Sequence, residues 1–298
     1  MRHDHVSQHP VQIGLGEMVH DEALAWMARR EDRSIHAVVT DPPYGALEFR
    51  EDQKAKLREG RGGVWRIPPS FDGSKRAPLP RFTTHSSKDA AMMAAFFGAF
   101  FAQVARVLTP GGHAIVATNP LFTHVVTSAA VGAGLEARGQ IVRLVMTLRG
   151  GDRPKNAHRE FDGVSVMARS QHEPWVIVRR PLDGTVAETL RRWGTGALRR
   201  VNAERPFGDV IDSAPTRKAE RALVPHPSLK PQALMRQLVR AALPLGAGVV
   251  LDPFAGGGST VAAGNAVGYA TIGIERDAEW FALACEGIPK LATLECAV

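Results

Sequence analysis

The sequence predicts an α/β fold with a mostly parallel sheet that helices cover on both faces. Apolar runs typical of buried strands alternate with helical patterns, most regularly after residue 230. Two apolar runs end abruptly, one in DPPYG (41–45) and one in DPFAGGGST (252–260). The 298 residues are 44% hydrophobic and 22% charged, which is ordinary for a globular protein. We therefore expect a single domain over residues 1–298.

The first part of the chain is divided by Pro and Gly residues. Met18, Leu24 and Met27 fall on one helical stripe, and Pro110 with the two following glycines ends a long apolar helix. The expected elements are a strand at 11–15, a helix over 17–30, a strand over 34–40, a helix over 90–108, a strand over 113–118, a helix near 121–131, and strands over 141–148 and 175–180.

The last part of the chain has the most regular order. Pro231 is a favoured first-turn residue and opens a helix. The expected elements are helices over 231–243, 259–268 and 277–288, with strands over 248–254 and 269–275. Two stretches, 45–88 and 181–225, lose periodicity and collect basic residues, and we expect both to be irregular.

The net charge of the chain bears on the kind of molecule that the protein binds. The net charge is +7 and the isoelectric point is about 9.8, which favours a nucleic-acid partner, because such a partner carries negative phosphates. A soluble protein that is merely basic remains the alternative at this point. The two cysteines, Cys285 and Cys296, are too few for a disulfide framework and form no zinc pattern, so we expect no metal site. We find no signal segment and no run of about 18 apolar residues, and so expect a cytoplasmic protein without a membrane span.

The glycine-rich segment indicates a ligand site at a strand end. Glycines at 256–258 can adopt positive φ and let a ligand approach the backbone, while the amides of the following helix favour an anion. A P-loop is excluded because Ser259, not lysine, follows Gly258, and the dinucleotide pattern is broken at Val261. Glu275 closes the next strand, where an acid commonly binds ribose hydroxyls. A small nucleoside without a phosphate chain fits best, although a plain strand-to-helix turn would show the same glycines.

The first strand end places an acid and an aromatic ring on a stiff turn. Pro42 and Pro43 cannot continue a sheet ladder, so Asp41 and Tyr44 are held where open α/β sheets bind ligands. In isolation, Asp41 could equally be a turn cap and Tyr44 a packed core residue.

Taken together, the two strand ends resemble those of the amino-methylating DNA methyltransferases that use S-adenosyl-L-methionine. The sequence DPPY comes early and FAGGG (254–258) comes late, which resembles the permuted, β-ordered subgroup of the N6-adenine and N4-cytosine enzymes. The segments HPSLKP (226–231) and HEPW (172–175) resemble two further elements of that subgroup. The resemblance implies a Rossmann-like methyltransferase fold with a mostly parallel seven-stranded sheet in circularly permuted order.

The resemblance also implies roles for individual residues. Thr260 and Lys230 would hold the methionine carboxylate, and Glu275 the ribose. Glu17 departs from the family's Asp at the adenine-binding position and is either a substitute for it or simply the first helical residue. The implied cofactor-binding residues are Asp252, Phe254, Ala255, Gly256, Gly258, Ser259, Thr260, Glu275, Lys230 and Glu17.

The implied catalytic residues are Asp41, Pro42, Pro43 and Tyr44. Hydrogen bonds from an exocyclic amine to the Asp41 carboxylate and the Pro42 carbonyl would aim the nitrogen lone pair at the methyl-sulfonium. Tyr44 would stack on a base flipped out of double-stranded DNA. Cytosine C5 chemistry is not expected, because it needs a cysteine nucleophile and neither cysteine follows proline.

The two irregular segments are the expected DNA contacts. Residues 45–88 follow the catalytic turn directly, and residues 181–225 fall where the family usually places target recognition. The arginines expected to bind DNA are Arg58, Arg61, Arg66, Arg191, Arg192, Arg199 and Arg200.

We expect adenine N6 as the target, because the cytosine N4 enzymes more often have Ser where Asp41 stands. Cytosine N4 methylation, a catalytically inactive nucleic-acid-binding relative and a dehydrogenase are the alternatives. A homodimer and a cognate restriction endonuclease are possible partners.

Overall fold

The computed structural model describes residues 10–43, 87–145, 153–154 and 156–296. Nine strands in this part of the chain form one sheet in the order β1-β2-β9-β8-β3-β4-β6-β5-β7. The strands are β1 (Val11–Ile13), β2 (Gly16–His20), β3 (Ile35–Thr40), β4 (Leu108–Ala117), β5 (Glu136–Leu144), β6 (His172–Arg179), β7 (Val210–Asp212), β8 (Val249–Asp252) and β9 (Ala270–Glu275).

The sheet is mostly parallel, as expected from the sequence. Only β1 and β6 run against their neighbours among the described strands. The structure has nine strands and not the expected seven, because β2 and β7 were not expected, whereas β1 lies within the expected strand at 11–15. β7 has only three residues, too few for a clear period-2 pattern, and β2 lies mostly within the stretch expected to be a helix over 17–30.

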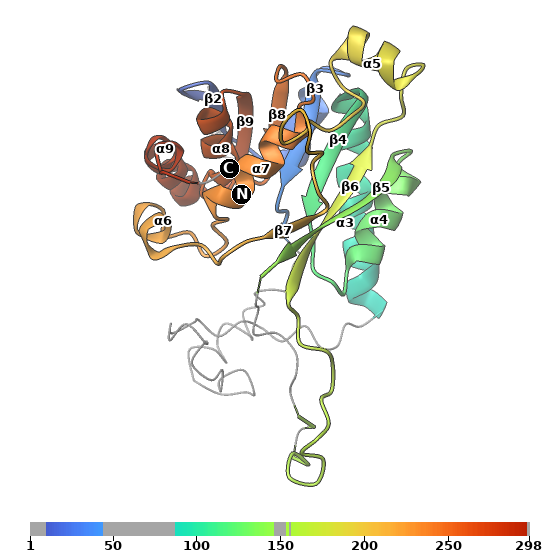
Figure 1. The fold of residues 1–298 in the computed structure, drawn as a ribbon, viewed down its shortest axis with the longest axis vertical. Coiled ribbons are helices and arrows are strands. Elements are labelled where there is room, and N and C mark those ends of the chain that lie inside the picture. The colour runs from blue at the N-terminus through green and yellow to red at the C-terminus, as the bar shows by residue number, and fades with distance from the viewer. Residues whose placement is uncertain (1–9, 44–86, 146–152, 155, 297–298) are drawn as a thin grey trace, which may run out of the picture.

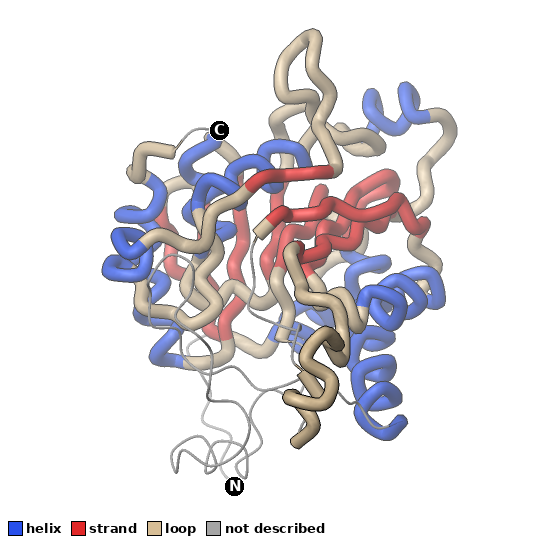
Figure 2. The backbone as a smooth tube through the Cα atoms, turned by 60° about the horizontal axis from the view of Figure 1, so that its bottom comes forward, coloured by secondary structure: helices blue, strands red, loops and turns tan. Residues whose placement is uncertain are grey.

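Helices cover both faces of the sheet (Figure 2). They are α1 (Ala23–Arg29), α3 (Ser87–Val107), α4 (Thr123–Gly132), α5 (Val186–Trp193), α6 (Lys218–Leu223), α7 (Gln232–Ala242), α8 (Ser259–Val267) and α9 (Ala278–Ala292). Helices α1, α3 and α4 pack on one face, and α7 and α8 pack on the other, with α9 beside α8. Central strand β3 is therefore buried on both sides, with Val38 facing one helix layer and Ala37 and Val39 the other.

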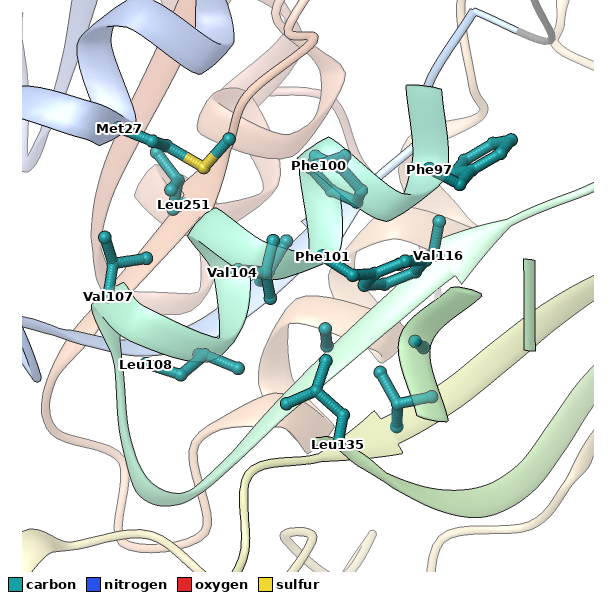
Figure 3. Close-up of a cluster of buried hydrophobic side chains, with 14 of the residues drawn as sticks. Met27, Phe97, Phe100, Phe101, Val104, Val107, Leu108, Val116, Leu135 and Leu251 are labelled. Carbon is teal, nitrogen blue, oxygen red and sulfur yellow. The ribbon is translucent and has the colours of Figure 1, made fainter. Parts of the chain in front are cut away.

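Helix α3 supplies the aromatic part of the larger core cluster. Phe97, Phe100 and Phe101 are fully buried and belong to one cluster with Val116 and Leu251 of the sheet, and Figure 3 shows Phe101 beside Val116. An 18-residue window of this helix, 90–107, has a mean hydropathy of 1.5 and is long and apolar enough to cross a membrane. The expectation that no such run exists was therefore wrong by this measure. Because its aromatic residues pack on the sheet, α3 is a core helix of this fold.

Two expected elements are wrong. Glu17 does not begin a helix, because residues 16–20 form β2, pairing with β1 and β9, and α1 begins only at Ala23. Residues 181–225 are not uniformly irregular, since they contain α5, β7 and α6. The start of α5 is marked in the sequence by Thr185 and Glu188, which form a reciprocal capping box.

The topology fixes where a ligand can bind. From the centre of the sheet, β8 continues to β9 on one side and β3 continues to β4 on the other. Strands β3 and β8 are parallel neighbours, so their carboxyl ends meet at the point where the strand order reverses. Ligands of open α/β sheets bind at such a point. Asp41 follows β3 and Asp252 ends β8, so both acids lie there.

We expect that Phe101→Ala will lower the free energy of unfolding by about 3–5 kcal/mol, because it removes a fully buried ring and leaves a cavity. Urea denaturation measures this change. Leu245→Ala is the control, since Leu245 is 60% exposed and its truncation should change the free energy by less than about 0.5 kcal/mol. Equal effects of the two substitutions would contradict the packing described for α3.

Candidate active site

A buried carboxyl group joins the two strands at the centre of the site. Thr40 Oγ1 at the end of β3 donates to Asp252 Oδ1 at 2.6 Å. The hydroxyl of Thr260, at the start of α8, donates to Asp252 Oδ2. The amide of Phe254 also donates to Oδ1, at 3.1 Å. Asp252 thus fixes β3, the glycine-rich segment and α8 relative to one another.

The environment of Asp252 changes its acidity. Asp252 is 4% exposed, and burial raises the pKa of its carboxyl from 3.8 to about 6, although the hydrogen bonds from Thr260, Thr40 and the Phe254 amide oppose this rise. The nearby charge of Asp41 acts in the same direction as burial. The Asp252 carboxyl therefore changes its protonation state near pH 6.

The glycine-rich segment is shaped for close approach of the backbone. Gly258 has a φ of +78°, and a Cβ atom there would lie 2.5 Å from Ile288 Cγ1 of α9. Gly256 has a φ of +48°, and a Cβ atom there would lie 2.9 Å from the ring of His226. Only glycine meets both demands at these two positions without strain.

Glu275 closes the other side of this segment. Its Oε2 accepts from the amide of Gly256 at 2.9 Å, and its Oε1 accepts from the amide of Asp277 at 2.8 Å. These bonds hold the carboxylate at the end of β9, beside the glycine backbone. Phe254 packs at ring distances of 6.0 and 5.5 Å against Phe96 and Phe100 of α3, which anchors the segment to the core.

Lys230 connects the turn after β3 to the antiparallel strand β6. Its Nζ lies 2.9 Å from Asp41 Oδ2 and also donates to Glu173 Oε1 at the start of β6. The ring of Trp175 lies beneath the ammonium group, with Nζ 5.8 Å from the ring centroid. Burial alone would lower the pKa of Lys230, but Asp41 and Glu173 raise it, so the ammonium stays charged.

Glu173 has a second cationic partner. Arg143 Nη1 on β5 donates to Glu173 Oε2 at 2.7 Å. Burial alone would raise the pKa of Glu173, but Lys230 and Arg143 lower it to about 2. The four side chains therefore form a chain of alternating charge from Arg143 through Glu173 and Lys230 to Asp41.

His226 supports the site as a turn residue. Its Nδ1 accepts from the amide of Ser228 at 3.2 Å, and its ring packs edge-on against Trp280 at 4.6 Å. Burial lowers the pKa of the imidazole, which favours the neutral ring.

The structure brings most of the expected site residues into one pocket. Those that line it are Asp41, Lys230, Asp252, Phe254, Ala255, Gly256, Ser259 and Thr260. Gly258 and Glu275 hold the same segment, as described above, and Pro42 and Pro43 follow Asp41 at the end of β3. Four expected residues, Tyr44, Arg58, Arg61 and Arg66, lie outside the described residues.

Glu17 is not brought to this pocket. It is the second residue of β2 and pairs with Gln12 and Ile272 in the sheet. The acid at the carboxyl end of β2 is Asp21, whose amide donates to the carbonyl of Glu275 at 3.1 Å. The expected helix over 17–30 concealed this strand end. A strand over residues 16–20 would have predicted Asp21, and not Glu17, as the acid at its carboxyl end.

Four expected DNA-binding arginines lie at the opposite end of the strands, away from the carboxyl ends of β3 and β8. Arg191 and Arg192 belong to α5, which is at the far end of the sheet from β7 (Figure 1). The Arg199 amide donates to Ala241, and the guanidinium of Arg199 donates to Tyr269, just before β9 begins. Arg200 donates to backbone carbonyls of its own loop. The structure does not bring these residues to Asp41.

Sequence reasoning missed Arg143 and Ser213. Arg143 is 6% exposed and donates to Ser213 Oγ and the carbonyl of Ala214, both at 3.1 Å. A single arginine in the apolar strand expected over 141–148 was the available signal, but its partners are 30 and 70 residues away. Such pairing appears only in the folded chain.

The raised pKa of Asp252 predicts a pH-dependent stability. Its folded-state pKa lies above 3.8, so the stabilisation is present below pH 4 and is lost as pH rises through about 6. Asp252→Asn does not titrate. Its free energy of unfolding should therefore improve relative to the wild type by up to about 3 kcal/mol between pH 4 and pH 7. Urea denaturation across this range measures the difference, with Asp209→Asn at an exposed site as control. A constant difference would show that Asp252 titrates normally.

Three comparisons identify the relatives of this chain. A family model described as DNA methylase matches residues 35–286. A curated relative, the Type II methyltransferase M2.DpnII of Streptococcus pneumoniae, is 30% identical over 87 residues, which are 29% of this chain. The match spans 32% of the length of that relative.

Solved structures share the fold. TTHA0409 of Thermus thermophilus, in complex with S-adenosyl-L-methionine, has a TM-score of 0.56 at 19% identity, covering 93% of this chain and 97% of that chain. The cytosine-N4-specific PvuII DNA methyltransferase has a TM-score of 0.58 at 14% identity, covering 94% and 86%. The M1.HpyAVI complex with S-adenosyl-L-methionine has a TM-score of 0.55 at 17% identity, covering 94% and 100%. Because the family model extends over most of the chain, from β3 through most of α9, the chain belongs to the N6/N4 DNA methylase family.

Proposed function

We propose that this chain transfers a methyl group from S-adenosyl-L-methionine to the exocyclic N6 amine of adenine in a specific sequence of double-stranded DNA. The observation that carries this proposal is the meeting of Asp41 and the glycine-rich segment at the carboxyl ends of β3 and β8. One strand end suits the amine that accepts the methyl group, and the other suits the cofactor.

The cofactor half of the site is the segment between Asp252 and Thr260. Glu275 is the proposed ribose ligand, and its support is its position at the end of β9 beside the Gly256 amide, since an acid at such a strand end commonly binds ribose. S-adenosyl-L-methionine is bound in the structures of TTHA0409 and M1.HpyAVI, which have the same fold. When bound, the cofactor supplies an electrophilic methyl group on a positively charged sulfur, and the protein supplies orientation.

The catalytic half acts on the target amine. The Asp41 carboxylate and the Pro42 carbonyl accept hydrogen bonds from the amine, which favour a more tetrahedral nitrogen. The nitrogen lone pair forms the new N–C bond. The S–C bond breaks at the same time, and the electron pair of the S–C bond remains on sulfur. The extra proton then leaves the methylated nitrogen. No strongly perturbed base is needed for this step. Tyr44 stays a predicted stacking partner for the flipped base, outside the described residues.

Adenine is the proposed target because an Asp, not a Ser, begins the catalytic motif. Cytosine N4 methylation is the second candidate, and it would use the same chemistry at Asp41. A catalytically inactive relative that only binds DNA is the third. The alternatives differ in the modified nucleoside that they leave in DNA.

The DNA contacts of the 181–225 segment are proposed for its second half. Residues 213 and 214 contact Arg143 beside the catalytic chain of charges, and Thr216 donates to the carbonyl of Leu229, next to Lys230. Arg217 and Lys218 are exposed in the same stretch. Residues 213–218 lie at the same end of the strands as the candidate site, whereas α5 lies at the opposite end. The 45–88 segment, a second subunit, a partner endonuclease and a cytoplasmic location stay predictions.

We expect the wild type to transfer labelled methyl groups to unmethylated genomic DNA and to leave N6-methyladenine after digestion to nucleosides and mass spectrometry. Asp41→Ala should abolish this product while S-adenosyl-L-methionine still binds, because Asp41 acts on the amine. N4-methylcytosine would move the target base and keep the mechanism. Cofactor binding without any methylated nucleoside would overturn the proposed activity on DNA.

We expect that Glu275→Gln will raise the Kd for S-adenosyl-L-methionine about tenfold, because a charge-assisted hydrogen bond to the ribose contributes on the order of 1.5–3 kcal/mol and the amide retains only part of it. Isothermal titration calorimetry measures the Kd. Glu279→Gln is the control, since Glu279 is an exposed acid in the first turn of α9. An unchanged Kd for the Glu275 variant would exclude the ribose role.

A further inference from the structure

Strands β5 and β6 carry two cross-strand ion pairs between Arg and Glu. Arg143 stands opposite Glu173 at one end of the strand pair, and Glu136 stands opposite Arg179 at the other. Both pairs are bonded, at 2.7 Å and 2.5 Å. They differ in surroundings, because the Glu136 side chain is 40% exposed and the Glu173 side chain is 18% exposed. The chain thus contains a matched internal comparison for the pair nearest Asp41.

Of these two pairs, Arg143–Glu173 lies at the active-site end of the strands. Among the described residues, this pair is connected through Lys230 to Asp41. Glu173 has both oxygens engaged, Oε2 with Arg143 and Oε1 with Lys230. Lys230 in turn contacts Asp41 at 2.9 Å. Four charges of alternating sign largely neutralise one another, which is what mostly buried charges require. Removing an inner charge would leave its neighbours inadequately paired.

Arg143 is fixed independently of Glu173. Its Nε donates to Ser213 Oγ and its Nη2 to the carbonyl of Ala214, so three nitrogens of one guanidinium are engaged. Ser213 and Ala214, which follow β7, therefore fix the orientation of the planar guanidinium group of Arg143. Glu173 is held by Arg143, and it presents its other oxygen to Lys230.

Lys230 has a geometry that differs from the expected cofactor role. The sequence resemblance implies that it holds the methionine carboxylate. In the structure its ammonium lies between two protein carboxylates and above the face of Trp175. These contacts engage two of the three N–H donors of the ammonium, so a cofactor carboxylate would have to share the ammonium with Asp41 and Glu173.

On the basis of these contacts, and resting on the proposed methyl transfer, we propose that Arg143 and Glu173 are positioning residues that hold Lys230 against Asp41. Lys230 then orients the Asp41 carboxylate toward the target amine and does not serve as a cofactor ligand. A small displacement of a catalytic group can cost on the order of a hundredfold in rate. The residues after β7 brace this arrangement through Arg143.

The test compares Glu173→Gln with Glu136→Gln, which removes the matching charge at the far end of the same two strands. Glu173→Gln should lower kcat about 10- to 100-fold, while the Kd for S-adenosyl-L-methionine and the KM for DNA change less than about twofold. Glu136→Gln should leave all three near their wild-type values. A Glu173→Gln enzyme with the kinetics of Glu136→Gln would overturn the inference.

A second variant separates positioning from cofactor binding. Lys230→Gln should lower kcat as Glu173→Gln does and leave the cofactor Kd within about twofold, and the double variant should be no slower than Lys230→Gln alone, because the residues act as a unit. A cofactor Kd raised tenfold or more would assign Lys230 to the methionine carboxylate and overturn the inference.

Two further outcomes complete the test. If Glu173→Gln does not fold, Arg143→Lys replaces it, because it keeps the charge and loses the fork to residues 213 and 214. The same loss of kcat at constant cofactor Kd is expected, and wild-type kinetics would overturn the inference. A wild type that methylates no DNA would overturn the proposed function and this inference together, whereas failure of the variants alone overturns only the inference.

Discussion

The buried carboxyl of Asp252 is the interaction on which the geometry of the site depends. Parallel strands β3 and β8 meet at the centre of the sheet, and the hydroxyls of Thr40 and Thr260 both donate to Asp252. A carboxyl buried to this degree is costly unless its oxygens are satisfied, and here three donors satisfy them. This bonding holds the end of β3 and the glycine-rich segment at one separation, at the carboxyl ends of two neighbouring strands.

A second constraint is electrostatic neutrality beside that carboxyl. Asp41 and Asp252 are close enough for the charge of Asp41 to raise the pKa of Asp252. Lys230 offsets the charge of Asp41, and Glu173 with Arg143 completes a neutral set. The arrangement also explains why an antiparallel strand is useful at this place. Because β6 runs antiparallel to β4 and β5, its amino end presents Glu173 beside the carboxyl ends of these two strands.

The two ends of the strands gather different residues. The carboxyl ends of the parallel strands gather the acids, glycines and buried cations of the candidate site. The opposite end contains α5 and the loops around Arg199 and Arg200. The guanidinium groups of Arg192, Arg199 and Arg200 there donate to Asp183, to Tyr269 and to backbone carbonyls. Residues 181–225 extend from one end to the other.

Several features followed from the sequence alone because they depend on local chemistry. Alternating strands and helices indicated the parallel α/β class, and the abrupt strand ends at Asp41 and Asp252 indicated the site. Prolines and glycines restrict the backbone wherever they occur, so these signals need no tertiary information. The tertiary structure alone decided the edge strand β7, the position of Glu17 within β2, and the grouping of Arg143, Glu173 and Lys230. Short edge strands are specified by their pairing partners, and ion pairs between residues 30 to 189 positions apart depend on how strands are ordered in the sheet.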